Sequence, residues 1–222
     1  MRDVFANRTE AGRLLARALA ALTLVDPVVL ALPRGGVPVA AEVADALHAP
    51  LDLLLVRKIG APGQRELAVA AIAEGPHNEP VIDRETLYFS GATMDYVERQ
   101  AEVERLEIER RRAAYLRGRP PLPVEGKTAV LVDDGIATGT TVRAALRALR
   151  RRRPARLVLA VPVAPAEAVA ALRGEVDDLV CLSQPAFFRA VGVPYVDFHQ
   201  VEDDEVIGIL DTHWQRASPA TP

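Results

Sequence analysis

The hydrophobic pattern of the chain alternates between apolar runs without a polar face and longer segments with apolar residues at helical spacing. The runs predict strands at 28–32, 51–56, 128–132, 157–163 and 177–182, and the periodic segments predict helices at 5–24, 37–47, 142–153, 165–173 and 202–215. Runs without a polar face are typical of strands that are buried on both sides of a parallel sheet. The pattern therefore predicts an α/β fold, with a mainly parallel sheet covered by helices on both faces.

The region between the second and third predicted strands departs from this alternation. Residues 60–65, Gly-Ala-Pro-Gly-Gln-Arg, have no apolar anchor and predict a mobile loop. Strands at 67–72 and 79–89, on either side of the turn Pro76-His77-Asn78, predict a hairpin. We therefore expect residues 60–92 to form a flexible loop and hairpin.

Residues 93–118 predict one long charged helix, with a thin apolar stripe formed by Tyr96, Val103, Leu106 and Ala113. Its mixed-charge face indicates a solvated cover or a dimer element, and we expect its arginines at 110–112 to lie in solvent. Residues 184–217 are expected to form a small C-terminal hood and the final helix. The whole chain, 1–222, is expected to fold as one domain.

The richest chemistry follows the strand at 128–132. Asp133 and Asp134 end this strand, and a short loop of small and hydroxylated residues leads to the next helix. Backbone N–H groups of such a loop converge at a helix N-terminus, where the helix dipole favours an anion. The loop has neither a dinucleotide-binding glycine pattern nor a P-loop lysine. A sugar phosphate would suit it, because the acids can accept hydrogen bonds from vicinal hydroxyls while the loop holds the phosphate.

The run Val-Leu-Val-Asp-Asp-x-x-Ala-Thr-Gly-x-Thr resembles the diphosphosugar-binding signature of type I phosphoribosyltransferases. The resemblance implies that Asp133 and Asp134 bind the ribose hydroxyls of 5-phosphoribosyl 1-diphosphate (PRPP). It implies that the 5′-phosphate is held by the loop residues Ile136, Ala137, Thr138, Gly139, Thr140 and Thr141. It also implies a Mg²⁺ ion that Asp133 and Asp134 hold indirectly, through water or ribose hydroxyls. The alternative is an Asp-Asp turn that caps an ordinary helix.

Two further segments are similar to parts of the same family. Pro33-Arg34-Gly35-Gly36, after the first strand, resembles the pyrophosphate loop, in which a strained and often cis peptide aims backbone donors at the diphosphate. Adjacent glycines would allow close approach and positive φ. Arg57 and Lys58, at the end of the second predicted strand, match basic residues that neutralise the leaving pyrophosphate. The alternatives are a tight turn with Arg34 in solvent and a solvated basic pair.

The aromatic-rich stretch 185–198 resembles the hood of 6-oxopurine phosphoribosyltransferases, which stacks the base on a ring. Phe187, Phe188 and Tyr195 are candidates, of which Phe188 is the predicted substrate contact; the alternative is that these rings close the core.

Two residues of that subgroup are missing. Ala137 stands where an aspartate usually contacts the base, and the segment 161–163 lacks the usual lysine. The segments Leu-Pro-Arg-Gly-Gly and Arg-Lys-x-Gly-Ala-Pro make the chain resemble most a group of functionally unassigned bacterial phosphoribosyltransferases.

Charge and composition narrow the partners. The formal net charge of −3 gives no global reason to expect nucleic acid, and the arginines at 150–153 are explained by the dipole at a helix C-terminus. Cys181 is the single cysteine, which excludes an intrachain disulfide and suits a reducing compartment. No signal peptide and no membrane-length apolar run is recognisable. We expect a cytoplasmic homodimer without nucleic-acid or membrane partners.

Taken together, the motifs predict transfer of ribosyl 5-phosphate from PRPP to a nitrogen acceptor, a nucleobase or related heterocycle, with release of pyrophosphate. Asp133, Asp134 and Lys58 are the predicted catalytic residues. The alternative is a regulator or sensor that binds PRPP without turnover. A sugar-phosphate hydrolase has no nucleophile–histidine pair to support it.

Overall fold

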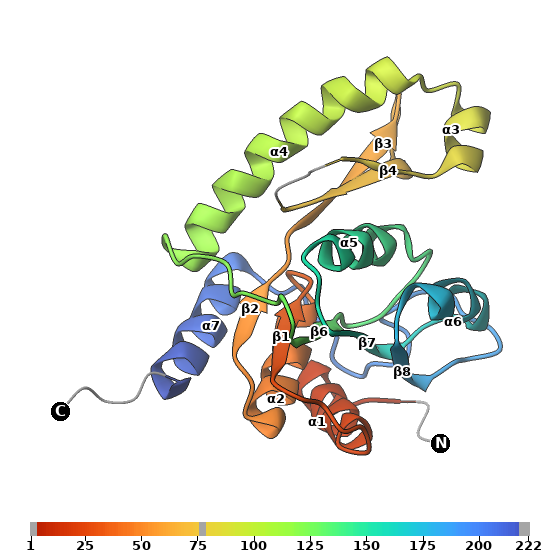
Figure 1. Cartoon of the computed structure of the whole chain (residues 1–222). Helices are drawn as coiled ribbons and strands as arrows, with labels where there is room; N and C mark the ends of the chain where they lie inside the picture. Colours follow the sequence, from red (N-terminus) through yellow and green to blue (C-terminus); the bar gives the residue numbers. More distant parts are fainter. Residues whose placement is uncertain (1–3, 76–78, 218–222) are drawn as a thin grey trace.

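The computed structural model describes residues 4–75 and 79–217. Its central sheet has five strands in the order β2-β1-β6-β7-β8, and every neighbouring pair is parallel (Figure 1). The strands are β1 (Pro27–Ala31), β2 (Leu51–Leu53), β6 (Thr128–Val132), β7 (Arg156–Val163) and β8 (Asp178–Ser183). The predicted parallel sheet is confirmed.

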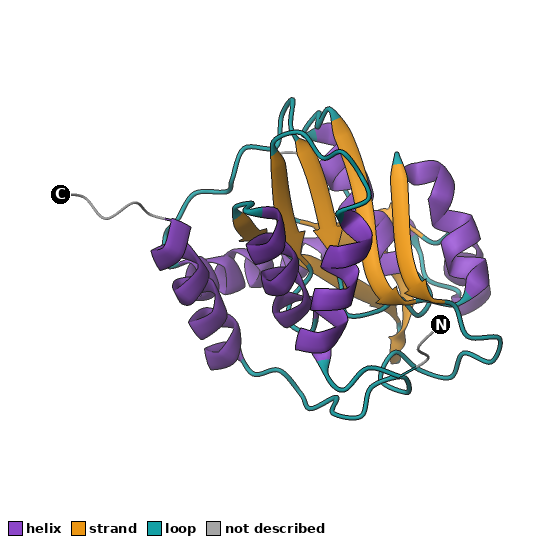
Figure 2. Cartoon of the chain, turned by 90° about the horizontal axis from the view of Figure 1, so that it is seen from below, coloured by secondary structure: helices purple, strands orange, loops and turns teal. Residues whose placement is uncertain are grey.

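Helices cover both faces of this sheet (Figure 2). One face packs against α1 (Arg8–Leu19), α2 (Gly36–Leu47) and α7 (Asp203–Ala217), and the other packs against α5 (Thr140–Arg151) and α6 (Ala166–Leu172), which a short 3₁₀ turn, η1 (Arg173–Glu175), follows. Successive strand residues alternate between the two cores: Val29 joins the first and Leu30 the second. Both faces are therefore apolar, which is why the strands read as continuous apolar runs.

A second layer stands beside the carboxyl ends of the central strands (Figure 1). It contains an antiparallel sheet of β3 (Val56–Ala61), β4 (Gln64–Ala73) and β5 (Val81–Ile82), together with α3 (Arg84–Ser90) and α4 (Met94–Leu116). Within residues 60–92, the sequence pattern did not predict the helix α3.

Three predictions for this region were wrong. The predicted strand 51–56 is divided, because β2 ends at Leu53 and the chain then turns into β3. The predicted loop 60–65 is the tight turn of the β3–β4 hairpin, where Gly63 adopts a φ of 74°. Most of the predicted strand 79–89 is α3, whose N-cap Asp83 accepts a hydrogen bond from the Thr86 amide at 3.0 Å. The predicted turn 76–78 lies outside the described residues.

The long helix α4 is confirmed, and Thr93 caps it by accepting a hydrogen bond from the Tyr96 amide. Its predicted apolar stripe was wrong, because Val103 and Leu106 are 58% and 69% exposed. The buried positions are Val97, Ala101, Ile108, Tyr115 and Leu116. Ala101, Ile108 and Tyr115 are seven residues apart, and Val97 lies four residues before Ala101, so they share the face that packs on β3, β4 and α7.

Smaller departures concern the ends of helices and one arginine. Asn7 caps α1 by accepting a hydrogen bond from the Glu10 amide at 2.9 Å, so the helix begins later than the predicted residue 5. Arg112 does not lie in solvent, because its guanidinium pairs with the buried Glu74.

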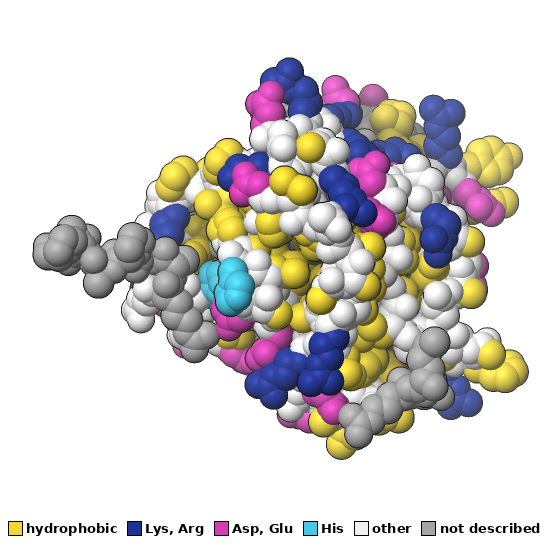
Figure 3. Space-filling view, turned by 60° about the horizontal axis from the view of Figure 1, so that its bottom comes forward, with side chains coloured by type: hydrophobic (Ala, Val, Ile, Leu, Met, Phe, Trp, Pro, Cys, Tyr) yellow, Lys and Arg dark blue, Asp and Glu magenta, His cyan; other side chains and the backbone are white. Residues whose placement is uncertain are grey.

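Acidic and basic side chains are interspersed with apolar ones on the face in Figure 3. Across residues 4–75 and 79–217, no helix is long and apolar enough to cross a membrane.

Candidate active site

The candidate site lies where the direction of strand progression reverses. Strands β1 and β6 are neighbours, but the helices that follow them, α2 and α5, cover opposite faces of the sheet. The loops after these two strands therefore diverge at the carboxyl ends of the strands, which is the usual ligand position in open α/β sheets. The amide of Leu32 donates to the carbonyl of Val132 at 2.9 Å, so the two loops begin side by side.

The glycine loop after β1 packs directly against the acidic pair. A Cβ atom on Gly35 would overlap Oδ2 of Asp134 and lie 2.6 Å from its Cγ. A Cβ on Gly36 would lie 2.9 Å from the carbonyl oxygen of Val132. The sequence suggested two reasons for adjacent glycines, close approach and positive φ. Gly35 has a φ of −59°, so positive φ is not the reason for a glycine at this position. Close approach is the reason. The peptide bond between Pro33 and Arg34 is cis.

Asp133 and Asp134 sit half-buried at the end of β6. The Asp134 amide donates to Oδ1 of Asp133 at 2.9 Å. Burial raises the pKa of Asp133, and the neighbouring Asp134 charge adds to this shift. Burial also raises the pKa of Asp134, but a hydrogen bond and charge from Arg8 oppose that rise. The pair is thus concentrated negative charge with one cation in direct contact.

The loop after the acidic pair leads into an uncapped helix N-terminus. Gly139 is the N-cap of α5, has a φ of 81° and makes no side-chain capping bond. The hydroxyls of Thr138 and Thr140 lie 3.4 Å apart across it. Ile136 is buried, and its amide donates to the Val163 carbonyl at 2.9 Å, so this amide stabilises the loop. The remaining geometry is that of an anion site at the start of a helix.

Lys58 and Arg57 lie inside β3, not at the end of a parallel strand as predicted. Both line a cavity of about 560 Å³ between the hairpin, α4 and the first turn of α5, which Thr141 also lines. The exposed Lys58 is near enough to Asp133 to counteract the rise in its pKa. Arg57 instead pairs with Glu104 of α4 at 2.7 Å. Arg65 and Arg111 also line this cavity, so its basic side chains outnumber the one lining carboxylate, Glu104.

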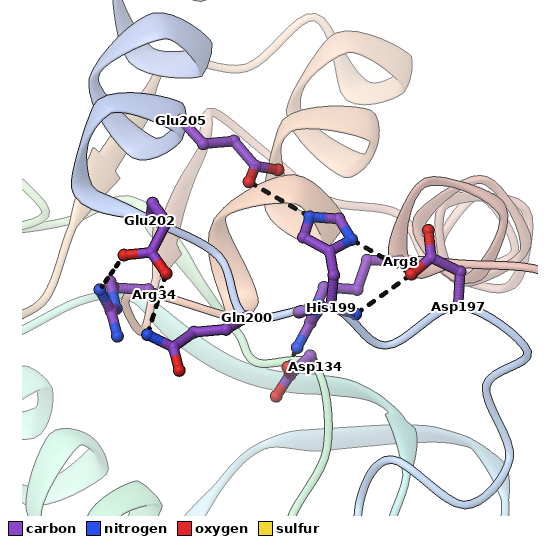
Figure 4. Close-up of polar contacts among 8 residues, drawn as sticks. All are labelled: Arg8, Arg34, Asp134, Asp197, His199, Gln200, Glu202 and Glu205. Carbon is purple, nitrogen blue, oxygen red and sulfur yellow. Dashed lines mark hydrogen bonds and ion pairs between the residues drawn. The ribbon is translucent and has the colours of Figure 1, made fainter.

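The side chain of Arg34 points away from the acidic pair, although its backbone is part of the glycine loop. Its Nη1 lies 3.3 Å from Glu202 and 3.4 Å from Asp203, at the start of α7 (Figure 4). A positively charged side chain near the acidic first turn of a helix is stabilised there by both carboxylates. The structure thus brings together the backbone of this loop and the acidic pair, but not the Arg34 guanidinium.

The aromatic side chains of the hood have different positions. Tyr195 is buried, with its ring 5.3 Å from that of Phe5, and its hydroxyl donates to the Asp134 carbonyl at 2.6 Å. It closes the core, as the alternative interpretation stated. Phe188 is half-buried and Phe187 is 91% exposed. Both line a cavity of about 680 Å³ that reaches Ala137 and Thr138 of the anion loop.

Comparison with known proteins gives the family. The phosphoribosyl transferase domain matches residues 6–199. The chain belongs to the phosphoribosyltransferase family. Two Mycobacterium tuberculosis proteins, provisionally named phosphoribosyl transferases, are each 49% identical over 211 residues, which is 94% of this chain and 46% of theirs. The chain thus spans about half the length of these curated relatives.

A solved structure of similar size agrees with this membership. The crystal structure of TT1426 from Thermus thermophilus is 47% identical and superposes with a TM-score of 0.80, over 93% of this chain and 97% of that chain. Phosphoribosyltransferases are glycosyltransferase-type enzymes, and the fold of this chain is that of the type I members.

Two contacts of this candidate site were not predicted from the sequence. Arg8 and Tyr195 are both bound to Asp134, from positions 126 and 61 residues away in the chain. Arg8 carried one signal, because a cation in the first turn of a helix opposes the helix dipole. No group of three or more His, Cys, Asp or Glu side chains within residues 4–75 and 79–217 could hold a metal ion.

Proposed function

We propose that this chain transfers ribosyl 5-phosphate from PRPP to a nitrogen of a heterocyclic acceptor and releases pyrophosphate. The observation that carries the proposal is the meeting of three features at the switch point between β1 and β6. These are the acidic pair, the glycine loop that packs against it, and the uncapped N-terminus of α5. Carboxylates that can accept hydrogen bonds from sugar hydroxyls therefore lie beside N–H groups that can donate to a phosphate. A phosphorylated sugar requires both.

In this proposal each part of PRPP has its own partner. Asp133 and Asp134 accept hydrogen bonds from the ribose hydroxyls, and residues 137–141 with the α5 N-terminus hold the 5′-phosphate. The backbone of residues 34–36 and the basic cavity around Lys58 receive the diphosphate. A pair of carboxylates, rather than a larger cluster, suits Mg²⁺ held indirectly, because this ion keeps several waters and takes substrate oxygens. The bound ion would neutralise diphosphate charge.

The protein's contribution to the reaction is mainly positioning and electrostatic. Bond breaking at the ribose leaves positive charge on the sugar and additional negative charge on the departing pyrophosphate. The acidic pair faces the first charge, and Lys58 is in position to stabilise the second. The cavity bordered by Phe188, Ala137 and Thr138 would hold the acceptor next to the ribose. A planar heterocycle could stack on the ring of Phe187 or Phe188 there.

Lys58→Ala should lower the turnover number by at least ~10-fold while changing PRPP affinity much less. Charge develops on pyrophosphate only as the bond breaks, so the lysine acts chiefly in the transition state, and ~10-fold corresponds to about 1.4 kcal/mol. Turnover and PRPP affinity are to be measured in parallel. Lys127→Ala is a matched control, because this second lysine pairs with Asp26 at the opposite end of β6. Equal losses of affinity and turnover in Lys58→Ala would contradict its role and favour a PRPP sensor.

Hypoxanthine and guanine should be poor acceptors. Ala137 cannot hydrogen-bond a purine nitrogen, and residues 161–163 supply no lysine for a 6-oxo group. Pyrophosphate release should be measured with PRPP, Mg²⁺ and a panel of purines, pyrimidines and carboxylated heterocycles. Rates within the usual enzyme range, roughly 1–1,000 per second, with either 6-oxopurine would contradict this prediction. A protein that binds PRPP and releases pyrophosphate with no member of the panel would contradict the proposed activity.

A further inference from the structure

Arg8 is a buried cation at a position where helix stability gives no reason for it. It is the first residue of α1, where the helix dipole disfavours positive charge, and it is 7% exposed. A buried guanidinium is costly unless it is paired and hydrogen-bonded. Its Nε donates to Oδ2 of Asp134 at 2.8 Å, which is the contact that satisfies its charge.

The same side chain also holds the end of the hood. Its Nη1 donates to the His199 carbonyl at 2.8 Å, and its guanidinium carbon lies 3.8 Å from the centre of the Phe198 ring. Figure 4 shows Arg8 between Asp134 and this segment. Arg8 is thus the direct link between the N-terminal helix, the acidic pair and the chain that leads to α7.

These contacts leave Asp134 one defined orientation. Gly35 packs on one side of its carboxylate, Arg8 bonds Oδ2, and the neighbouring Asp133 carboxyl is within hydrogen-bonding reach of it. Arg8 also offsets one of two adjacent negative charges, in a site that must accept an anionic sugar phosphate. With a neutral residue in place of Arg8, the Asp134 carboxylate would lose the contact that orients it, and its negative charge would lack a cation in contact.

We propose that Arg8 is a positioning residue of the ribose site: it fixes the Asp134 carboxylate toward the ribose and ties the hood segment to it. The inference rests on the proposed function, because it takes Asp134 as a ribose ligand. It assigns a functional role to the N-terminal helix. It also predicts that ligands with a ribose depend on Arg8 and that pyrophosphate alone does not.

The test is calorimetric titration of the full chain with ribose 5-phosphate and, separately, with pyrophosphate, at constant Mg²⁺. In Arg8→Gln the dissociation constant for ribose 5-phosphate should rise at least ~10-fold, as expected when a charge-assisted hydrogen bond that orients a ligand is lost. The constant for pyrophosphate should change by less than about 3-fold. Arg8→Lys should fall between the parent and Arg8→Gln, because lysine keeps the charge but cannot donate to Asp134 and His199 in the same fork.

Arg13→Gln is the matched control, since Arg13 lies on the same helix but pairs with Glu42 of α2 rather than with Asp134. It should bind both ligands like the parent. Equal losses for the two ligands, unchanged ribose 5-phosphate binding in Arg8→Gln, or the same loss in Arg13→Gln would each overturn the role of Arg8. If Arg8→Gln does not fold, the comparison of Arg8→Lys with the parent decides. A folded parent that binds neither ligand would overturn the ribose site itself.

Discussion

Gly35→Ala is expected to weaken PRPP binding at least ~100-fold while the chain still folds. The added methyl group would overlap the Asp134 carboxylate, and neither the glycine loop nor this carboxylate can move freely. Arg8 and the backbone hold Asp134, and the adjacent Gly36 is itself packed against the Val132 carbonyl. The methyl group must therefore displace the loop, the carboxylate or both. A ~100-fold loss corresponds to about 2.7 kcal/mol, a moderate effect for displacing preorganised donors and acceptors.

Titration with PRPP and a thermal melt, on the same preparations, separate binding from folding. Gly208→Ala is the control, because a Cβ at this exposed helical position would meet no atom within 4 Å. It should bind PRPP like the parent and gain a little stability, since alanine is the better helix former. Parent-like PRPP affinity in Gly35→Ala would show that the glycine loop does not border the ligand.

Local pattern was sufficient to predict the central sheet and to place Asp133 and the glycine loop at one edge of it. Each central strand is a short apolar run without a polar face, which is typical of a strand buried on both sides. In a parallel sheet the loops after the strands meet at one edge. Asp133 and Gly35 were therefore expected to be close on the pattern of the sequence alone. The reason for Gly35 was not predictable, because the carboxylate that excludes a side chain there is about one hundred residues away in the sequence.

Other features depend on long-range packing that single-sequence patterns do not encode. Lys58 lies in an antiparallel hairpin because β2 ends after three residues, although the apolar run continues to Val56. The buried face of α4 was missed because Val103 and Leu106 are apolar yet exposed, while the smaller Ala101 is buried. Arg8 shows the same limit: its function depends on Asp134, and no local pattern connects the two.

The second layer is fastened to the core by a buried ionic cluster around Glu74. This residue follows β4, and both of its carboxylate oxygens accept from Nη1 of Arg112, at 2.8 and 2.7 Å. Arg152, just after α5, donates to the Glu74 carbonyl at 3.0 Å. Burial raises the pKa of Glu74, and Arg112 opposes that rise. The cluster therefore joins the layer that carries Lys58 to the helix that begins at the anion loop.

Glu74→Ala should lower the free energy of unfolding by about 3–5 kcal/mol, because removing one member of a buried ion pair leaves the other charge uncompensated. Arg112 would then keep its longer contact with Asp52, whose Oδ2 is 3.8 Å from Nη2. Glu74→Gln keeps the shape and one oxygen acceptor, so its loss should be smaller. Denaturant unfolding measures all three proteins, with Glu125→Ala as the control for the exposed pair with Arg153, which is expected to cost less than about 1 kcal/mol. Similar losses of unfolding free energy in Glu74→Ala and Glu125→Ala would contradict this role of the cluster. Apolar contacts alone would then hold the second layer on the core.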